Sequence, residues 1–115
     1  MDGMMIEQNF TDIAALADIP RQGARTLTTK HGTIAVFRTL DDQVFALRDS
    51  CPHRAGPISQ GIIHGHGVTC PLHGWVISLE SGAAEGEAAP CIARFRTRIE
   101  QSRVLIDLTG PIALL

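Results

Sequence analysis

The chain has 115 residues, a formal net charge of −2 and 44% hydrophobic residues, which is an ordinary composition for a globular protein of one domain. No excess of positive charge indicates nucleic acid as a partner. No apolar run approaches the roughly 18 residues that cross a bilayer, and the N-terminus lacks the basic and apolar regions of a secretory signal. Three cysteines form no readable disulfide framework. We therefore expect one domain, residues 1–115, in the reducing cytoplasm, without membrane or nucleic-acid partners.

The first half of the chain predicts a short helix followed by a β-hairpin. Residues 11–20, TDIAALADIP, favour a helix with Thr11 as its cap. Residues 32–40, GTIAVFRTL, and 43–50, QVFALRDS, have the composition of strands, and Asp41–Asp42 is a candidate for a two-residue turn between them. This hairpin leads directly into a cysteine-bearing loop.

The second half predicts loops with short strands and then a second hairpin. Residues 56–74 hold five of the eleven glycines and two prolines, which favours tight turns around the short strands IIHG and GVTC. Residues 75–82, WVISLESG, predict a strand that ends in a turn. Residues 92–100, IARFRTRIE, alternate with three arginines on one face, and residues 103–108, RVLIDL, follow as a final strand. The predicted fold is all-β, an antiparallel β-sandwich or barrel with a Gly/Pro-rich insertion.

Residues 51–75 concentrate the residue types that bind metals. They hold two of the three cysteines and four of the five histidines. Cys51-x-His53 is followed, after sixteen residues, by Cys70-x-x-His73. Each half supplies one thiolate and one imidazole, so the two halves together make four ligands, a full set for a metal centre.

Three metal centres compete for these four ligands. Structural zinc usually takes its two cysteines from one short motif and its two histidines from another, whereas each loop here mixes the two types. Blue copper uses a single cysteine with two histidines. A [2Fe–2S] cluster with one all-cysteine and one all-histidine iron takes one ligand for each iron from each loop. Two alternatives remain open. One is a zinc site, and the other is that the four residues are core cysteines and surface histidines that bind no metal.

If the [2Fe–2S] assignment holds, Cys51 and Cys70 bind the iron that stays ferric, and His53 and His73 bind the iron that accepts the electron. Neutral imidazoles in place of two thiolates make the centre less negative. We therefore expect a reduction potential above that of an all-cysteine cluster, in the range of about −150 to +300 mV.

The remaining cysteine, histidines and tryptophan are expected to have structural roles. Cys91 is interpreted as a small, partly buried apolar residue rather than a fifth ligand. His64 and His66 could bind metal in a different register, but their place at a glycine-flanked loop tip favours solvated or structural side chains. His31 is expected at the surface in a turn, and Trp75 in the core.

The two ligand motifs resemble the cluster-binding boxes of Rieske [2Fe–2S] domains. CPHRAGP, residues 51–57, and CPLHGW, residues 70–75, carry this resemblance, which extends to GTIAVFRTLDDQVFALRDSCPH before the boxes and ISLESGAA after them. The extra cysteines of the disulfide-bearing respiratory type are missing from both boxes. Within the superfamily, HGHGVTCPLH and the strand before the first box look most like the small subunit of bacterial assimilatory NAD(P)H-dependent nitrite reductase.

This resemblance implies a Rieske-type β fold with a two-loop cluster-binding subdomain at about residues 50–76. It also implies one [2Fe–2S] cluster per chain on Cys51, His53, Cys70 and His73. The chain would transfer electrons without being catalytic alone. Its expected partner is a large nitrite reductase subunit with FAD, a [4Fe–4S] cluster and siroheme, which reduces nitrite to ammonia with NAD(P)H during nitrate assimilation.

Two other functions stay open. The chain also resembles the Rieske ferredoxins that carry electrons from a flavoprotein reductase to an aromatic-ring dioxygenase. Nitrite reductase small subunits commonly have Asn after the second ligand histidine, where this chain has Gly74, and glycine is common there in the dioxygenase ferredoxins. The third alternative is a zinc-bound structural module.

Overall fold

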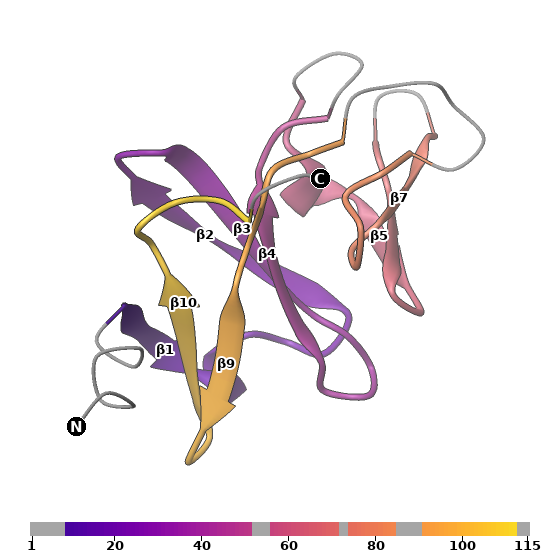
Figure 1. Ribbon diagram of the computed structural model, residues 1–115. Coiled ribbons are helices and arrows are strands. Elements are labelled where there is room, and N and C mark those ends of the chain that lie inside the picture. Colours follow the sequence, from indigo (N-terminus) through magenta and orange to yellow (C-terminus); the bar gives the residue numbers. More distant parts are fainter. Residues whose placement is uncertain (1–8, 52–55, 72–73, 85–90, 113–115) are drawn as a thin grey trace.

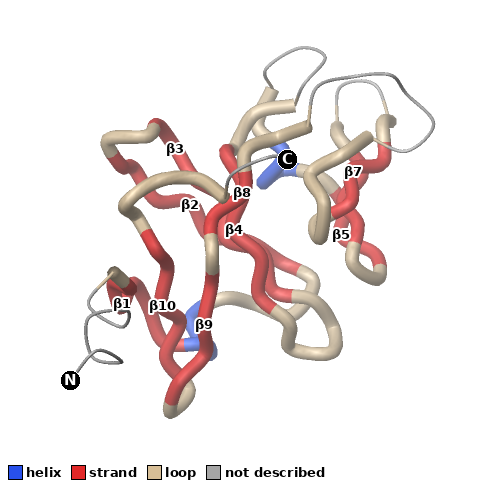
Figure 2. Tube along the Cα trace, in the orientation of Figure 1, coloured by secondary structure: helices blue, strands red, loops and turns tan. Residues whose placement is uncertain are grey.

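The computed structural model describes residues 9–51, 56–71, 74–84 and 91–112. These residues form three antiparallel sheets and two short 3-10 turns, and they contain no α-helix (Figures 1 and 2). The predicted all-β, antiparallel fold is thus confirmed. No helix within the described ranges is long and apolar enough to cross a membrane.

The central sheet has the strand order β2-β3-β4-β8, with β2 at Gly23–Thr29, β3 at Gly32–Arg38, β4 at Val44–Arg48 and β8 at Arg94–Phe95. The predicted hairpin corresponds to β3 and β4, but its turn is longer than two residues. The Thr39 N–H donates to the Gln43 carbonyl at 2.9 Å, and Asp42 has a left-handed φ of 65°. A three-residue loop with its last residue left-handed is the next most common hairpin connection after two-residue turns.

The second sheet has the order β1-β10-β9, with β1 at Phe10–Ala15, β9 at Thr97–Glu100 and β10 at Arg103–Asp107. The helix predicted for residues 11–20 is therefore wrong: only Leu16–Asp18 form a 3-10 turn, η1. Phe10 pairs with Asp107 and Ala15 with Arg103, so hydrogen bonds to β10 override the local helical preference. Strand β2 was not predicted, since GARTLTT has no strong alternation.

The last hairpin departs from the prediction at one residue. The strand expected over residues 92–100 breaks at Arg96 into β8 and β9, which belong to different sheets. Arg94, Arg96 and Arg98 therefore do not share one sheet face. The turn that follows is tight, with left-handed φ values of 49° at Gln101 and 64° at Ser102.

The third sheet is small and lies to one side of the central sheet in Figure 1. Its order is β5-β6-β7, with β5 at Ile62–His64, β6 at Gly67–Thr69 and β7 at Val76–Ser78. A 3-10 turn, η2 at Ile58–Gln60, leads into β5. The short strands predicted from IIHG and GVTC are confirmed.

The central strands are buried on both faces, which explains the uninterrupted apolar run in β3. Successive side chains of a strand point to opposite faces. The side chains on one face of β3 and β4, together with both cysteines of the predicted site, belong to what we call the cysteine core: Ala35, Phe37, Leu47, Cys51, Ile58, Ile63, Val68, Cys70, Ile77, Leu79, Ala84 and Ile92. The side chains on the other face belong to what we call the second core: Ile19, Ile34, Val36, Val44, Ala46, Phe95, Val104 and Ile106.

Candidate metal centre

Two of the four predicted ligands, Cys51 and Cys70, lie in the same core. Cys51 follows β4 and Cys70 follows β6 directly, and each residue is only 1% exposed. All three cysteines of the chain are described, and none of them forms a disulfide. The fold therefore brings together two thiols that are nineteen positions apart in the sequence, in apolar surroundings that exclude water.

The two cysteine loops are closed in the same way. The N–H of Cys51 donates to the carbonyl of Gly56, and the N–H of Cys70 donates to the carbonyl of Trp75. Both bonds span five residues, and both measure 2.7 Å. Each loop thus leaves a strand, begins with Cys-Pro and returns to its own first residue.

Gly74 completes the second loop. Its N–H donates to the Cys70 carbonyl at 3.0 Å, and its φ of 71° lies in the left-handed region. Glycine and asparagine are the two residues most often found in this conformation. Glycine therefore suits the left-handed backbone at position 74.

The other two predicted ligands, His53 and His73, fall on residues 52–55 and 72–73, outside the described residues. Among the residues that are described, no three His, Cys, Asp or Glu side chains form a group that could hold a metal ion. The described thiols nonetheless fit the donor set of a Rieske centre. Two soft sulfur ligands lie in one core, at the starts of two loops with the same closure, and each loop includes a histidine.

His64 and His66 have other partners. His64 Nε2 lies 2.7 Å from Thr69 Oγ1. His66 Nε2 lies 3.1 Å from an Asp41 carboxylate oxygen, and its Nδ1 lies 3.5 Å from Glu80 Oε2. The hydrogen bond to Asp41, with a further contribution from Glu80, raises the pKa of His66 above its usual 6.5. The pKa of Asp41 is lowered, first by the Thr39 hydroxyl and then by His66.

This His66 contact links two sheets. Asp41 belongs to the β3–β4 turn of the central sheet, whereas His66 and Glu80 flank strands of the third sheet. The His66 ring also packs on Phe45 of β4, with 5.4 Å between ring centroids. The sequence contains no local signal for this pair, because His66 and Asp41 are 25 positions apart.

Two predictions for residues outside the ligand set need correction. His31 is half-buried rather than a surface residue: its Nε2 lies 3.1 Å from the Leu108 carbonyl, and its ring contacts Phe95. Cys91 is exposed rather than partly buried. The neighbouring Ile92 takes the buried position instead, where its N–H donates to the Gly82 carbonyl at 2.8 Å. Trp75 packs against the cysteine core, as predicted.

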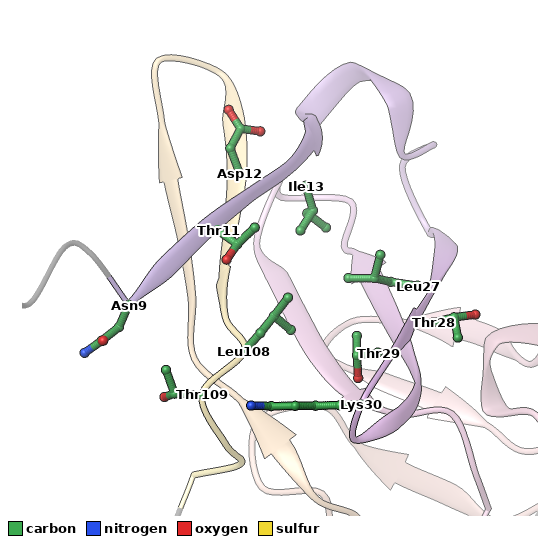
Figure 3. Close-up of a pocket in the computed structure, with 10 residues that line it drawn as sticks. All are labelled: Asn9, Thr11, Asp12, Ile13, Leu27, Thr28, Thr29, Lys30, Leu108 and Thr109. Carbon is green, nitrogen blue, oxygen red and sulfur yellow. The ribbon is translucent and has the colours of Figure 1, made fainter.

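A groove of about 680 Å³ lies on a different part of the molecule, between β1 and β2 (Figure 3). Both strands are edges of their sheets. Figure 3 shows Lys30 extending from the β2–β3 turn toward Thr109, with Ile13, Leu27 and Leu108 as apolar lining. The sequence had pointed to no such pocket. None of its lining residues belongs to the cysteine core, so the groove is separate from the candidate metal centre.

Comparison with known proteins relates the chain first to ferredoxins. The chain is 29% identical over 105 residues to the ferredoxin component of the naphthalene 1,2-dioxygenase system of Pseudomonas aeruginosa. This match covers 89% of this chain and 98% of that protein. It is also 45% identical over 42 residues to a 4β-methylsterol monooxygenase of Methylococcus capsulatus, but this match spans only 36% of the chain and 11% of the monooxygenase.

Solved structures add a second group. A protein provisionally named as the small subunit of an NADPH nitrite reductase matches with a TM-score of 0.75 and 26% identity, over 84% of this chain and 96% of that one. A complex of oxygenase and ferredoxin in carbazole 1,9a-dioxygenase contains a chain with a TM-score of 0.79; at 20% identity, this match shows the fold alone.

The family itself is shown by a model described as the Rieske [2Fe–2S] domain, which matches residues 9–98 and so includes both cysteine loops. This match agrees with the antiparallel fold and with the two buried thiols at the starts of paired loops. The chain belongs to the Rieske [2Fe–2S] domain family, and it is an electron-transfer protein that binds a [2Fe–2S] cluster.

Proposed function

We propose that Cys51, His53, Cys70 and His73 are the ligands of the cluster. The observation that carries this assignment is the pair of buried thiols at the starts of two loops. Each loop is closed by a backbone hydrogen bond between residues five positions apart. Each loop also contains one histidine, two or three residues after its cysteine. Cys91 is exposed on another segment and stays outside the set.

The cluster supplies one-electron chemistry when bound, and the chain determines its surroundings. The cysteine core keeps water from the two thiolates, which raises the energetic cost of releasing them as free charges. The closure of each loop occupies the N–H of its cysteine and fixes the direction from which that thiolate approaches. Such outer contacts tune the potential of an iron–sulfur centre.

The electron-transfer system that we propose is NAD(P)H-dependent nitrite reductase, with this chain as its small subunit. The match to the provisionally named nitrite reductase small subunit supports it, since it covers 96% of that chain at 26% identity. The finer resemblance of HGHGVTCPLH points the same way, whereas Gly74 departs from the nitrite reductase pattern and is common at this position in the dioxygenase ferredoxins. The partner would be the large subunit, and nitrite the substrate of that subunit.

A dioxygenase ferredoxin is the second candidate. The observation that favours it is the naphthalene dioxygenase ferredoxin, which matches over 98% of its own length. In this case the chain would carry electrons between a flavoprotein reductase and an oxygenase. In either system we place it in the cytoplasm as one domain, with residues 50–76 as its cluster-binding part.

Two measurements test these proposals. Iron and acid-labile sulfide in the anaerobically purified protein should be equal, and the reduced protein should show the EPR signal of a mixed-ligand [2Fe–2S] centre. Zinc without sulfide would refute the ligand assignment. For the system, the chain should restore NAD(P)H-dependent nitrite reduction when added to a purified siroheme-containing large subunit. Activity only with a ring-hydroxylating oxygenase and its reductase would favour the second candidate.

A further inference from the structure

Asp49 makes a contact that the cluster-binding function does not by itself explain. Its carboxylate accepts two hydrogen bonds from Ser59, one from the backbone N–H at 2.8 Å and one from the hydroxyl at 2.7 Å. Both residues are partly buried. Asp49 lies two positions before Cys51, and Ser59 lies just after the loop has closed at Gly56. The pair therefore joins the two ends of the first ligand loop.

Ser59 is the middle residue of η2, and Asp49 acts as the cap of this 3-10 turn. A turn of this kind begins with N–H groups that have no partner within it. Pro57, at the N-cap position, makes no side-chain hydrogen bond there. Asp49 supplies the missing acceptor from ten residues earlier, and its own N–H donates to the Thr33 carbonyl at 2.9 Å. The cap is thus anchored to the central sheet.

The residue that follows this 3-10 turn lies against the residue that precedes the second ligand loop. Ile58 is fully buried in the cysteine core, together with Cys51 and Cys70. A Cβ atom placed on Gly61, the residue after η2, would lie 2.3 Å from the carbonyl oxygen of Thr69. No side chain fits there, so the backbone after η2 lies directly against the residue that precedes Cys70.

These contacts form one connected path from the first loop to the second. Asp49 holds Ser59, η2 places Ile58 in the core, and Gly61 lies against Thr69. We propose that Asp49 is a positioning residue, which caps η2 and thereby fixes the separation of the two ligand loops and the geometry of the cluster between them. The proposal rests on the ligand assignment of Cys51 and Cys70.

The test compares the anaerobically purified holoprotein with Asp49→Ala. The variant should show a changed EPR line shape in the reduced state and a shifted midpoint potential. Iron should pass to a chelator about tenfold faster, because hydrogen bonds to a charged group are lost. Ser59→Ala keeps the backbone donor, so its iron release should be only about threefold faster. Asp49→Asn keeps an acceptor oxygen and should restore most of the native EPR line shape.

Asp18→Ala is the matched control. Asp18 also accepts a hydrogen bond at a 3-10 turn: the backbone N–H of Ala15, at the start of η1, donates to its carboxylate at 3.2 Å. Neither Ala15 nor any residue of η1 belongs to the cysteine core. Loss of this hydrogen bond should lower the melting temperature without changing the EPR signal, the midpoint potential or the rate of iron release. Gly61→Ala tests the other end of the path: it should change the EPR signal while the contact between Asp49 and Ser59 stays intact.

Three results would overturn the proposal. One is an Asp49→Ala protein that loses thermal stability as Asp18→Ala does but keeps the native EPR signal, potential and iron release. If Asp49→Ala does not fold, a native EPR signal, midpoint potential and rate of iron release in both Ser59→Ala and Gly61→Ala would also overturn the proposal. Wild-type protein without a [2Fe–2S] cluster would overturn the ligand assignment and this proposal with it, whereas the first two results leave the assignment standing.

Discussion

The two faces of the central sheet are equally buried but differently built. The second core is covered by the sheet β1-β10-β9, whose strands run for four to six residues, and it contains only aliphatic and phenylalanine side chains. The cysteine core is covered by strands of three residues each and contains Cys51 and Cys70. Strands this short form few ladder hydrogen bonds. We therefore expect the second core to be stabilised by packing alone, and the cysteine core to depend also on the cluster that we propose for its loops.

The largest effect should come from removing a thiol. Cys51→Ser and Cys70→Ser should each abolish the cluster and loosen residues 51–75, because metal binding is coupled to folding. Iron and sulfide content, the visible spectrum and hydrogen exchange measure both effects. Cys91→Ser is the matched control, since this cysteine is exposed and should be dispensable. A bleached Cys91→Ser protein would contradict the ligand assignment.

A matched pair of core substitutions compares the two faces directly. Ile77 on β7 and Ile106 on β10 are both fully buried, the first in the cysteine core and the second in the other. Replacement of either by Ala should lower the free energy of unfolding by about 2–5 kcal/mol. Only Ile77→Ala should also speed the release of iron to a chelator. Equal rates of release from both variants would mean that the two cores do not act separately.

Two glycines in turns provide a smaller test. Gly82 has a φ of 77°, and a Cβ atom on it would lie 2.4 Å from the Ile92 carbonyl oxygen; Gly32 has a φ of 93° and open space around it. Gly32→Ala should cost about 1–2 kcal/mol from backbone strain alone. Gly82→Ala should cost more, since the buried Ile92 backbone must also move. Urea unfolding measures both, and equal costs would contradict the close contact in the cysteine core.

The smallest effect concerns the contact of His66 with Asp41 and Glu80, which ties the third sheet to the β3–β4 turn. Because folding raises the pKa of His66 above 6.5, its contribution to stability is fully present below pH 6.5 and is lost as pH rises through the folded-state value. The difference in urea midpoint between wild type and His66→Gln should therefore shrink from about pH 6 to about pH 9. The same comparison in an Asp41→Asn background should show a weaker pH dependence, and a difference that grows with pH would refute this account.

Local sequence signals predicted the parts of the fold that depend on neighbouring residues. The β3–β4 hairpin, the short strands IIHG and GVTC, and the final strand at Arg103–Asp107 follow from composition and turn residues. The helix predicted from Thr11 failed because pairing with β10, whose partner residues are 88 to 97 positions away, outweighs the helical preference of an alanine-rich segment. The predicted ligands could be identified from the sequence because four metal-binding residues in two closely spaced pairs, each in a short Gly/Pro-rich loop, are typical of a metal site.

The sequence by itself determined the type and spacing of the predicted ligands, because cysteine and histidine chemistry and loop length are local properties. Only the tertiary structure decided that Cys51 and Cys70 share one core, that Asp49 caps η2 and that His66 meets Asp41. These contacts join residues 10 to 25 positions apart through sheets whose register depends on packing over both faces of β3 and β4. The physical reason is that burial and hydrogen-bond partners depend on the stacking of all three sheets, which no segment can specify alone.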